Sequence, residues 1–243
     1  MVLAVDVGNT KTAVALVEGS TIRARAQWPT DQTGAAVFEG ALGRAPGAER
    51  IVVATVVPRA RRAWDDVATW LSLPITVLSR GDQVPVTCDV DEPSKVGVDR
   101  LVNLLGAALD DAPPLVVVDL GTATTIDALD RSGHFVGGAI LPGAGTAMRA
   151  LAASTAQLPE VRLVAPPSPI GRNTAHAIQS GVVLGYAGGI DSLVAAISRE
   201  LGGATCVATG GLAAVFAPHC RCFHRVDDTI TLRGIARAWE LAR

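Results

Sequence analysis

Two stretches of the chain carry the residue types that hold phosphate groups. Asp6-Val7-Gly8-Asn9-Thr10 follows an apolar run, and Asp119-Leu120-Gly121-Thr122 follows a second, β-branched run. Each places a carboxylate at the end of an expected strand, then a glycine that lets backbone approach a ligand, then amide or hydroxyl donors. A hairpin turn uses the same residue types, so one copy alone is ambiguous. The second copy, offset by 113 residues, favours two turns that aim carboxylates at one polyphosphate and its divalent cation.

A third stretch, Gly97-Val98-Asp99-Arg100, combines a carboxylate and a guanidinium at the expected start of a helix. The apolar residues that follow have the spacing of one helical face and place the helix start near Asp99. Asp99 is therefore either a cap for the free amides of that helix or the group that takes a proton from an attacking hydroxyl. In the second case Arg100 binds an anionic part of the acceptor.

Polar residues also open an expected helix at Gly171-Arg172-Asn173-Thr174, where they either cap the helix or hold a small substrate. His176 has no nucleophile or orienting acid near it in the sequence. The sequence contains no G-x-x-x-x-G-K-[ST] motif, no H-E-x-x-H motif and no complete dinucleotide fingerprint at Gly143-Ala144-Gly145. Hydrolase, zinc-enzyme and dinucleotide-binding functions are therefore disfavoured.

The four cysteines are too few and too clustered to staple a chain of this length, so we expect reduced thiols. The string from His219 to His224 holds residue types that bind zinc, but its C-x-C spacing is not that of C-x-x-C zinc sites. In a strand, Cys220 and Cys222 would share one face, which favours buried thiols.

Two similar α/β units are the simplest arrangement that positions these motifs. Each unit begins with hairpin-linked strands, the second of which runs over residues 12–17 or 124–129. In the first half, we expect strands at 51–54 and 75–78 around a helix from about Arg59 to Leu71, with Arg59, Arg61 and Arg62 on its solvated face. Pro113-Pro114 marks the boundary between an N-terminal lobe, 1–112, and a C-terminal lobe, 113–243.

In the second half, residues 174–198 predict helices interrupted at Gly188-Gly189. Residues 205–208 predict a strand that ends at Thr209-Gly210-Gly211, and residues 231–243 predict a last helix. The proline-rich stretch 158–171 excludes a helix and predicts a surface loop or flap.

Length and composition are those of a folded globular protein. The chain has 243 residues, of which 49% are hydrophobic, and a net charge of −2, which argues against a nucleic-acid-binding surface. The N-terminus lacks the basic flank and apolar length of a secretory signal, and no apolar run approaches the roughly 20 residues of a membrane span. We therefore expect a cytoplasmic protein with neither nucleic acid nor membrane as a partner.

Taken in order, the motifs resemble those of the type III pantothenate kinases, within the superfamily of acetate and sugar kinases, Hsp70 and actin. The first phosphate motif, the G-x-D-R segment, the second phosphate motif and two later motifs of that family are matched by Asp6–Thr10, Gly97–Arg100 with Asn103, Asp119–Thr125, Gly137–Gly143 and Asn173-Thr174. The resemblance spans nearly the whole chain. It implies two RNase H-like lobes of the actin-like ATPase fold, each a mixed five-stranded sheet flanked by helices, and an obligate homodimer.

The resemblance also implies a reaction, which is transfer of the γ-phosphoryl group of ATP to the primary hydroxyl of pantothenate, the first step of coenzyme A biosynthesis. Asp99 would be the proton acceptor, and pantothenate would contact Gly97, Val98, Asp99, Arg100 and Thr174. ATP would contact Asp6, Val7, Gly8, Asn9, Thr10, Lys11, Thr12, Ala13 and Thr122. Asp119 would hold the K⁺ or NH₄⁺ ion that the family requires, and Mg²⁺ would accompany the nucleotide near Asp6. The glycine turn at 209–211 resembles the turn on the adenosine side of superfamily sites.

The chain departs from the family pattern at Val90, where many members carry tyrosine. Valine cannot donate a hydrogen bond, so affinity for the substrate falls by about 1 kcal/mol or more if a buried partner is left unpaired. A kinase for another small hydroxy-acid therefore remains an alternative. A catalytically idle relative of the Bvg accessory factor type, linked to transcriptional regulation, is the other. Intact Asp6, Asp99, Arg100 and Asp119 argue against idleness, as does the lack of a basic stripe.

Overall fold

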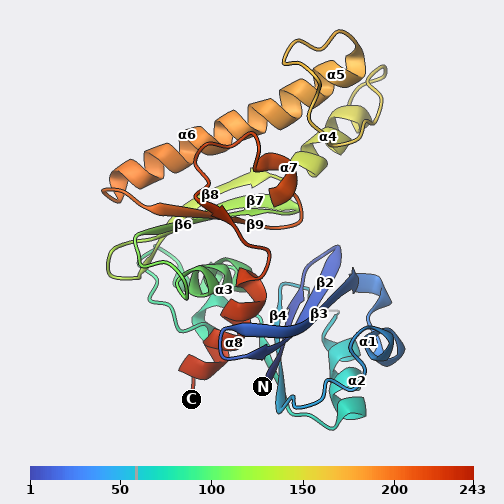
Figure 1. Cartoon of the computed structure of the whole chain (residues 1–243), viewed down its shortest axis with the longest axis vertical. Helices are drawn as coiled ribbons and strands as arrows, with labels where there is room; N and C mark the ends of the chain where they lie inside the picture. The colour runs from blue at the N-terminus through green and yellow to red at the C-terminus, as the bar shows by residue number, and fades with distance from the viewer. Residues whose placement is uncertain (58–59) are drawn as a thin grey trace. The chain divides into compact units, whose positions relative to one another are not determined.

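The computed structural model describes residues 1–57 and 60–243. They form two compact units, one made of residues 1–112, 133–135 and 229–243, the other of residues 113–132 and 136–228 (Figure 1). The expected lobes, 1–112 and 113–243, differ from these units in the placement of the C-terminal helix and of residues 133–135. The C-terminal helix groups with the first unit because it packs against a helix and three strands of that unit.

The first unit is built on a mixed five-stranded sheet in the order β3-β2-β1-β4-β5. Its strands are β1 (Val2–Val7), β2 (Lys11–Glu18), β3 (Thr21–Pro29), β4 (Arg50–Thr55) and β5 (Ile75–Leu78). β1, β2 and β3 form an antiparallel meander, whereas β4 and β5 run parallel to β1. The central strands β1 and β4 are nearly continuous apolar runs because both faces of the sheet are covered. The predicted hairpin and the strands predicted at 51–54 and 75–78 are confirmed.

Helices cover both sides of this sheet (Figure 1). They are α1 (Ala35–Leu42), α2 (Arg61–Leu71), α3 (Val98–Ala107) and α8 (Ile230–Leu241), with short 3-10 turns at Thr30–Gln32, Gly81–Gln83 and Pro93–Lys95. On the α1 and α2 side, the rings of Trp28, Phe38 and Trp64 pack with centroids 6.3 to 6.4 Å apart. The predicted start of the second helix at Arg59 lies outside the described residues; Arg61 and Arg62 are exposed.

The second unit repeats the topology of the first. Its strands are β6 (Leu115–Leu120), β7 (Ala123–Leu129), β8 (Phe135–Pro142), β9 (Thr205–Thr209) and β10 (Arg225–Val226). The order β8-β7-β6-β9-β10 matches β3-β2-β1-β4-β5, and β6 pairs antiparallel with β7 and parallel with β9. The predicted duplication of one α/β unit is confirmed, and so is the mixed five-stranded sheet in each half.

The helices of the second unit are α4 (Ala144–Ala153), α5 (Thr174–Gln179), α6 (Gly185–Glu200) and α7 (Ala213–Phe216), with a π-helical turn, η5, at Ser180–Leu184. The predicted interruption at Gly188-Gly189 is wrong, because α6 runs through both glycines. Each glycine costs about 1 kcal/mol of helix propensity, but Ala187 and Ile190 beside them are buried in the core and hold the helix together. Residues 158–171 contain no helix, as predicted.

Together, α5, η5 and α6 form one helical stretch, Thr174–Glu200, that is long and apolar enough to cross a membrane by length and composition alone. The expectation that no such run exists is therefore corrected, because isoleucine, valine, leucine and alanine together give this stretch a high mean hydropathy. One side of the stretch packs on the core of the second unit through Val183, Ala187, Ile190 and Val194.

Candidate active site

The turn between β1 and β2 is braced by threonines from outside it. The Gly8 N–H donates to Lys11 O at 3.0 Å, and the Thr30 hydroxyl donates to Gly8 O at 2.8 Å. The Thr30 N–H donates to Thr10 O at 3.1 Å, and the Thr12 and Thr30 hydroxyl oxygens are 3.1 Å apart. Sequence reasoning missed Thr30, because it lies some 20 residues from the turn and only the folding of β3 brings it there.

The same turn presents polar groups to solvent. Asn9, Thr10 and Lys11 are exposed, and Asp6 is half-buried at the end of β1. Thr12 is fully buried behind the turn, so its hydroxyl braces the loop. The Lys11 ammonium donates to Gln27 Oε1 at 2.9 Å, which holds its charge over β3. Exposed amide, hydroxyl and ammonium donors on a rigid turn can bind an anion such as a phosphate group.

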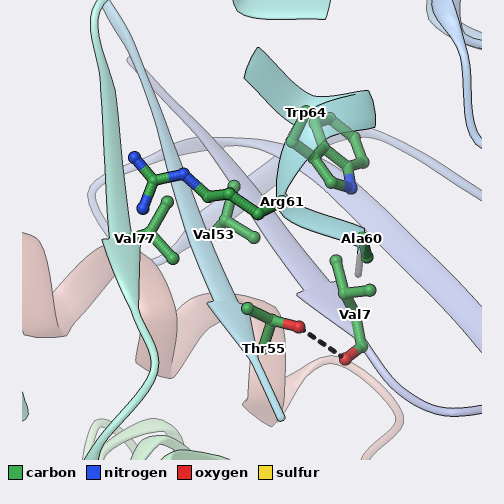
Figure 2. Close-up of a pocket in the computed structure, with 7 residues that line it drawn as sticks. All are labelled: Val7, Val53, Thr55, Ala60, Arg61, Trp64 and Val77. Atoms are coloured by element: carbon green, nitrogen blue, oxygen red, sulfur yellow. Dashed lines mark hydrogen bonds between the residues drawn. The ribbon is translucent and has the colours of Figure 1, made fainter. Parts of the chain in front are cut away.

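A hollow beside this turn is not a phosphate site. Figure 2 shows it between α2 and the ends of β1, β4 and β5, with the Thr55 hydroxyl donating to Val7 O at 3.4 Å. Its lining residues are Val7, Val53, Thr55, Ala60, Arg61, Trp64 and Val77. Because most of this lining is apolar, the hollow offers no set of donors to a polyphosphate.

The G-x-D-R segment forms the first turn of α3. Gly97 is the N-cap residue, with φ −63° and ψ 136°, and α3 begins at Val98. The Asp99 carboxylate folds back, so that Oδ1 accepts the Arg100 N–H at 3.0 Å. A Cβ on Gly97 would lie 2.5 Å from Asp99 Oδ1, so glycine at position 97 leaves room for this orientation. Asp99 Oδ1 thus satisfies a free amide in the first turn of α3, as expected of a cap. This hydrogen bond does not involve Asp99 Oδ2.

In the second unit, Asp119 lies at the end of β6 against the turn that follows β9. It pairs in register with Thr125 of β7 and Thr209 of β9. Gly210 has φ +92°, and a Cβ there would lie 2.4 Å from Asp119 Oδ1. Only glycine adopts this backbone conformation readily and lets the turn close onto the carboxylate.

A second carboxylate lies on the same face of the sheet as Asp119. Asp127 of β7 is fully buried, and its Oδ2 accepts the Thr125 hydroxyl at 2.8 Å. Because Val117 is opposite Asp127 and Asp119 is opposite Thr125, the two aspartates share one sheet face. Asp127 was not singled out from the sequence, although its spacing of two from Thr125 was the available signal.

The loop after Asp119 rests on the start of α4. The Gly143 N–H donates to Thr122 O at 3.0 Å, and the Thr146 hydroxyl donates to the same oxygen at 2.9 Å. A Cβ on Gly143 would lie 2.3 Å from Gly121 O. The second phosphate motif therefore lies beside the first turn of a helix, where free amides and the helix dipole favour anions.

The remaining candidate, Thr174, is exposed at the first position of α5. Asn173 caps this helix, since its Oδ1 accepts the His176 N–H at 2.8 Å. The candidate residues thus form two groups, with residues 6–13 and 97–100 in the first unit and Asp119, Thr122 and Thr174 in the second.

The cysteine-rich string is not a strand. Residues 219–224 lie in an irregular segment between α7 and β10, so the expected alternation of faces is wrong. The Asp191 carboxylate accepts the N–H groups of Arg221 and Cys222 and shapes this segment. Burial, with Asp191 and Cys206 nearby, raises the pKa of Cys220 to about 12. Hydrogen bonding to Cys206, together with burial, also raises the pKa of Cys222.

Oxygen atoms are the donors that this site offers to cations. Across residues 1–57 and 60–243, no group of three or more His, Cys, Asp or Glu side chains has the arrangement of a metal site. The carboxylates of Asp6 and Asp119 at the two glycine turns are hard oxygen donors, the kind of ligand that Mg²⁺ prefers.

Two sheets of one topology, each with an aspartate and a glycine turn after its first strand, define the duplicated fold of the actin-like ATPases and sugar kinases. Solved structures agree. The chain is similar to a protein described as a Baf family transcriptional activator from Campylobacter jejuni, with TM-score 0.64, 19% identity and coverage of 99% and 98% of the two chains. It is also similar to a protein described as a 2-dehydro-3-deoxygalactonokinase from Sinorhizobium meliloti, with TM-score 0.62, 16% identity and coverage of 100% and 99%. At these identities the likeness shows the fold.

The chain belongs to the type III pantothenate kinase family, whose model matches residues 2–196. It is 35% identical to the type III pantothenate kinase of Moorella thermoacetica, with 99% of each chain covered. It is 38% identical to that of Rhizorhabdus wittichii, with 99% and 98% covered, and 37% identical to that of Thermus thermophilus, with 98% of each covered. The chain is thus a kinase that transfers phosphate from ATP to pantothenate in coenzyme A biosynthesis, and an idle relative is not favoured.

Proposed function

We propose that Asp99 is the general base of the pantothenate kinase reaction and that Gly97, Val98, Asp99, Arg100 and Thr174 contact pantothenate. The observation that carries this proposal is the carboxylate of Asp99, fixed in the first turn of α3 by the Arg100 N–H at 3.0 Å. A fixed carboxylate within reach of a hydroxyl is sufficient as a base, because phosphoryl transfer depends mainly on positioning and charge stabilisation.

In the proposed reaction, the primary hydroxyl of pantothenate gives its proton to Asp99 as its oxygen attacks the γ-phosphorus of ATP. The bond between this phosphorus and the β,γ-bridging oxygen breaks, and ADP leaves. Arg100 binds the pantothenate carboxylate, for which a guanidinium fork is well suited. Thr174, exposed at the start of α5, donates its hydroxyl to the same substrate.

Residues 6–13 and Thr122 bind ATP in this proposal. The threonine brace holds the first phosphate turn rigid while Asn9, Thr10 and Lys11 stay exposed. Thr12 and Ala13 act from behind the turn, since Thr12 is fully buried. Thr122 lies beside the start of α4, where amides favour a phosphate group.

Mg²⁺ enters with the nucleotide near Asp6, and Asp119 holds a monovalent cation, K⁺ or NH₄⁺. Bound cations neutralise charge that develops on the transferring phosphoryl group. The support for Asp119 is its carboxylate, which lies against Gly210 at the end of β6.

The enzyme works as a homodimer in this proposal. Support comes from the exposed side of the stretch 174–200. Only 28% of the 18-residue apolar window in this stretch is buried inside the structure. Small residues follow one another on that side at spacings of three and four, namely Ala177, Gly181, Gly185, Gly188, Ser192 and Ala195. Such a face lets a second copy approach closely, and it explains the apolar helix without a membrane.

Light scattering on the purified protein tests the dimer. A mass near twice 24.9 kDa is expected, and Gly185→Glu should lower it towards that of one chain. Gly40→Glu, on the exposed face of α1, is the matched control and should leave the mass unchanged. A monomeric wild-type protein at micromolar concentration would contradict the dimer.

A cytoplasmic location without nucleic-acid partners is also proposed, in keeping with the net charge of −2.

Replacing Asp99 with asparagine tests the assignment of the base. Asp99→Asn preserves the shape of the side chain but removes the proton acceptor, so turnover should fall on the order of 100-fold or more while ATP affinity is kept. Asp91→Asn, an exposed aspartate in the preceding segment, is the control and should remain active. Nearly full activity of folded Asp99→Asn would remove Asp99 from this role.

A further inference from the structure

Phe135 is the first residue of β8. The rest of β8 belongs to the second unit, but Phe135 groups with the first unit. Its N–H donates to Thr87 O at 2.8 Å, and its carbonyl accepts the Asp89 N–H at 2.8 Å. These bonds form a parallel bridge between Phe135 and Cys88. The backbone of Phe135 is thus held by this pairing, and its ring is buried, with the side chain 1% exposed.

The ring of Phe135 meets the guanidinium of Arg100. The Arg100 Cζ lies 5.1 Å from the ring centroid, within the range of a cation–π contact. Arg100 follows Asp99 in the first turn of α3. Without a contact to restrain it, its long side chain would populate many rotamers. A guanidinium held over a buried ring samples fewer orientations, which reduces the entropy lost when a ligand binds it.

We propose that Phe135 is a positioning residue that orients Arg100 toward the carboxylate of the acceptor substrate. This inference rests on the proposed role of Arg100 in binding pantothenate. Phe135 does not itself contact substrate; it acts through the guanidinium. Its influence should therefore fall on the affinity for the acidic acceptor, and neither on ATP binding nor on the chemical step.

Steady-state kinetics of Phe135→Leu test this role. Leucine keeps an apolar side chain but has no ring, so the KM for pantothenate should rise about five-fold, the equivalent of a typical cation–π contact, with kcat and the KM for ATP unchanged. Phe216→Leu is the matched control. Phe216 is also fully buried, but it packs in the second unit beside Tyr186, and its loss should leave the KM for pantothenate unchanged.

Two further variants separate orientation of Arg100 from simple packing. Incorporation of 3,4,5-trifluorophenylalanine at position 135 keeps the shape of the ring but weakens the attraction of its face for a cation, so the KM should rise in a folded protein. In an Arg100→Gln background, Phe135→Leu should have little further effect on the KM.

An equal rise in KM from Phe135→Leu in both backgrounds would overturn the inference, as would an unchanged KM in the trifluorinated protein. If Arg100→Gln alone leaves the KM for pantothenate unchanged, the proposed role of Arg100 fails and the role of Phe135 fails with it. That outcome is distinct from a failure of Phe135 alone, in which Arg100→Gln raises the KM and the changes at position 135 do not.

Discussion

Gly106 of α3 and Gly234 of α8 lie against each other where the two helices cross. A Cβ on Gly234 would lie 1.8 Å from Val102 O and 2.9 Å from Gly106 N, and a Cβ on Gly106 would lie 1.9 Å from Ile230 O. Around this contact, the Thr231 hydroxyl donates to Asn103 Oδ1 at 2.7 Å. The C-terminal helix thereby holds the helix whose first turn carries Asp99 and Arg100.

Gly234→Ala should destabilise the protein, because the clash is with backbone atoms that no side-chain rotation relieves. Overpacking of this kind costs about 1–3 kcal/mol, which corresponds to a fall in Tm of roughly 2–12 °C for a chain of this size. Thermal unfolding followed by circular dichroism measures it. Gly40→Ala in α1, where no atom lies within 4 Å of the added Cβ, is the control. It should be neutral or stabilising by up to about 1 kcal/mol, and equal Tm values for both variants would contradict the close crossing.

Gly97→Ala should lower kcat while leaving Tm nearly unchanged. The added Cβ displaces the Asp99 carboxylate, which can rotate away at little cost to the fold but then loses its bond to the Arg100 N–H. We expect a fall in kcat of about ten-fold, as when a catalytic group is misplaced by a fraction of an ångström. Gly34→Ala, at the N-cap of α1 with open space around it, is the matched control. A wild-type kcat for Gly97→Ala would show that the orientation of Asp99 is unimportant.

Asp119→Asn should abolish the response to monovalent cations. An amide lacks the negative charge that holds K⁺ or NH₄⁺, so rates in potassium, ammonium and sodium buffers should become equal. Initial rates at saturating ATP and pantothenate measure this. Glu160→Gln, which removes an exposed carboxylate from the same unit, should leave the response intact. A mutant that still responds as the wild type does would place the cation elsewhere.

Val90→Tyr should lower the KM for pantothenate about five-fold, the value of one hydrogen bond near 1 kcal/mol, with kcat unchanged. Val90 is half-buried and lies two residues beyond Cys88, which bridges Phe135. Val90→Phe separates the hydroxyl from the added ring and should not lower the KM. Loss of activity in folded Val90→Tyr would show that the larger side chain is not accommodated at position 90.

Much of the fold could be predicted because its signals are local. The β-branched runs that end at Asp6 and Asp119, each followed by a glycine turn, were enough to predict two hairpins and a duplicated unit. The helix at Asp99 was predicted to within one residue from its apolar face. Each of these patterns is confined to neighbouring residues, so it can be recognised without knowing the rest of the chain.

What could not be predicted depends on contacts between distant residues. The Thr30 hydroxyl bonds to Gly8 O, and Phe135 forms a bridge with Cys88. Neither pairing can be predicted from a local sequence pattern. The continuity of α6 through Gly188-Gly189 reflects burial of its other side, which outweighs the poor helix propensity of glycine. Each of these features depends on tertiary packing, which composition and local patterns do not reveal.

The most direct test of the catalytic assignment is the rate of ADP release by the purified wild-type protein and by Asp99→Asn, with ATP, Mg²⁺ and pantothenate, in potassium and in sodium buffer. The wild type should turn over pantothenate in potassium and much more slowly in sodium. Asp99→Asn should turn over pantothenate on the order of 100-fold more slowly, or slower still, in potassium while still binding ATP. Equal turnover by folded Asp99→Asn and wild type would contradict the proposed base. Equal wild-type rates in the two buffers would contradict the cation assigned to Asp119.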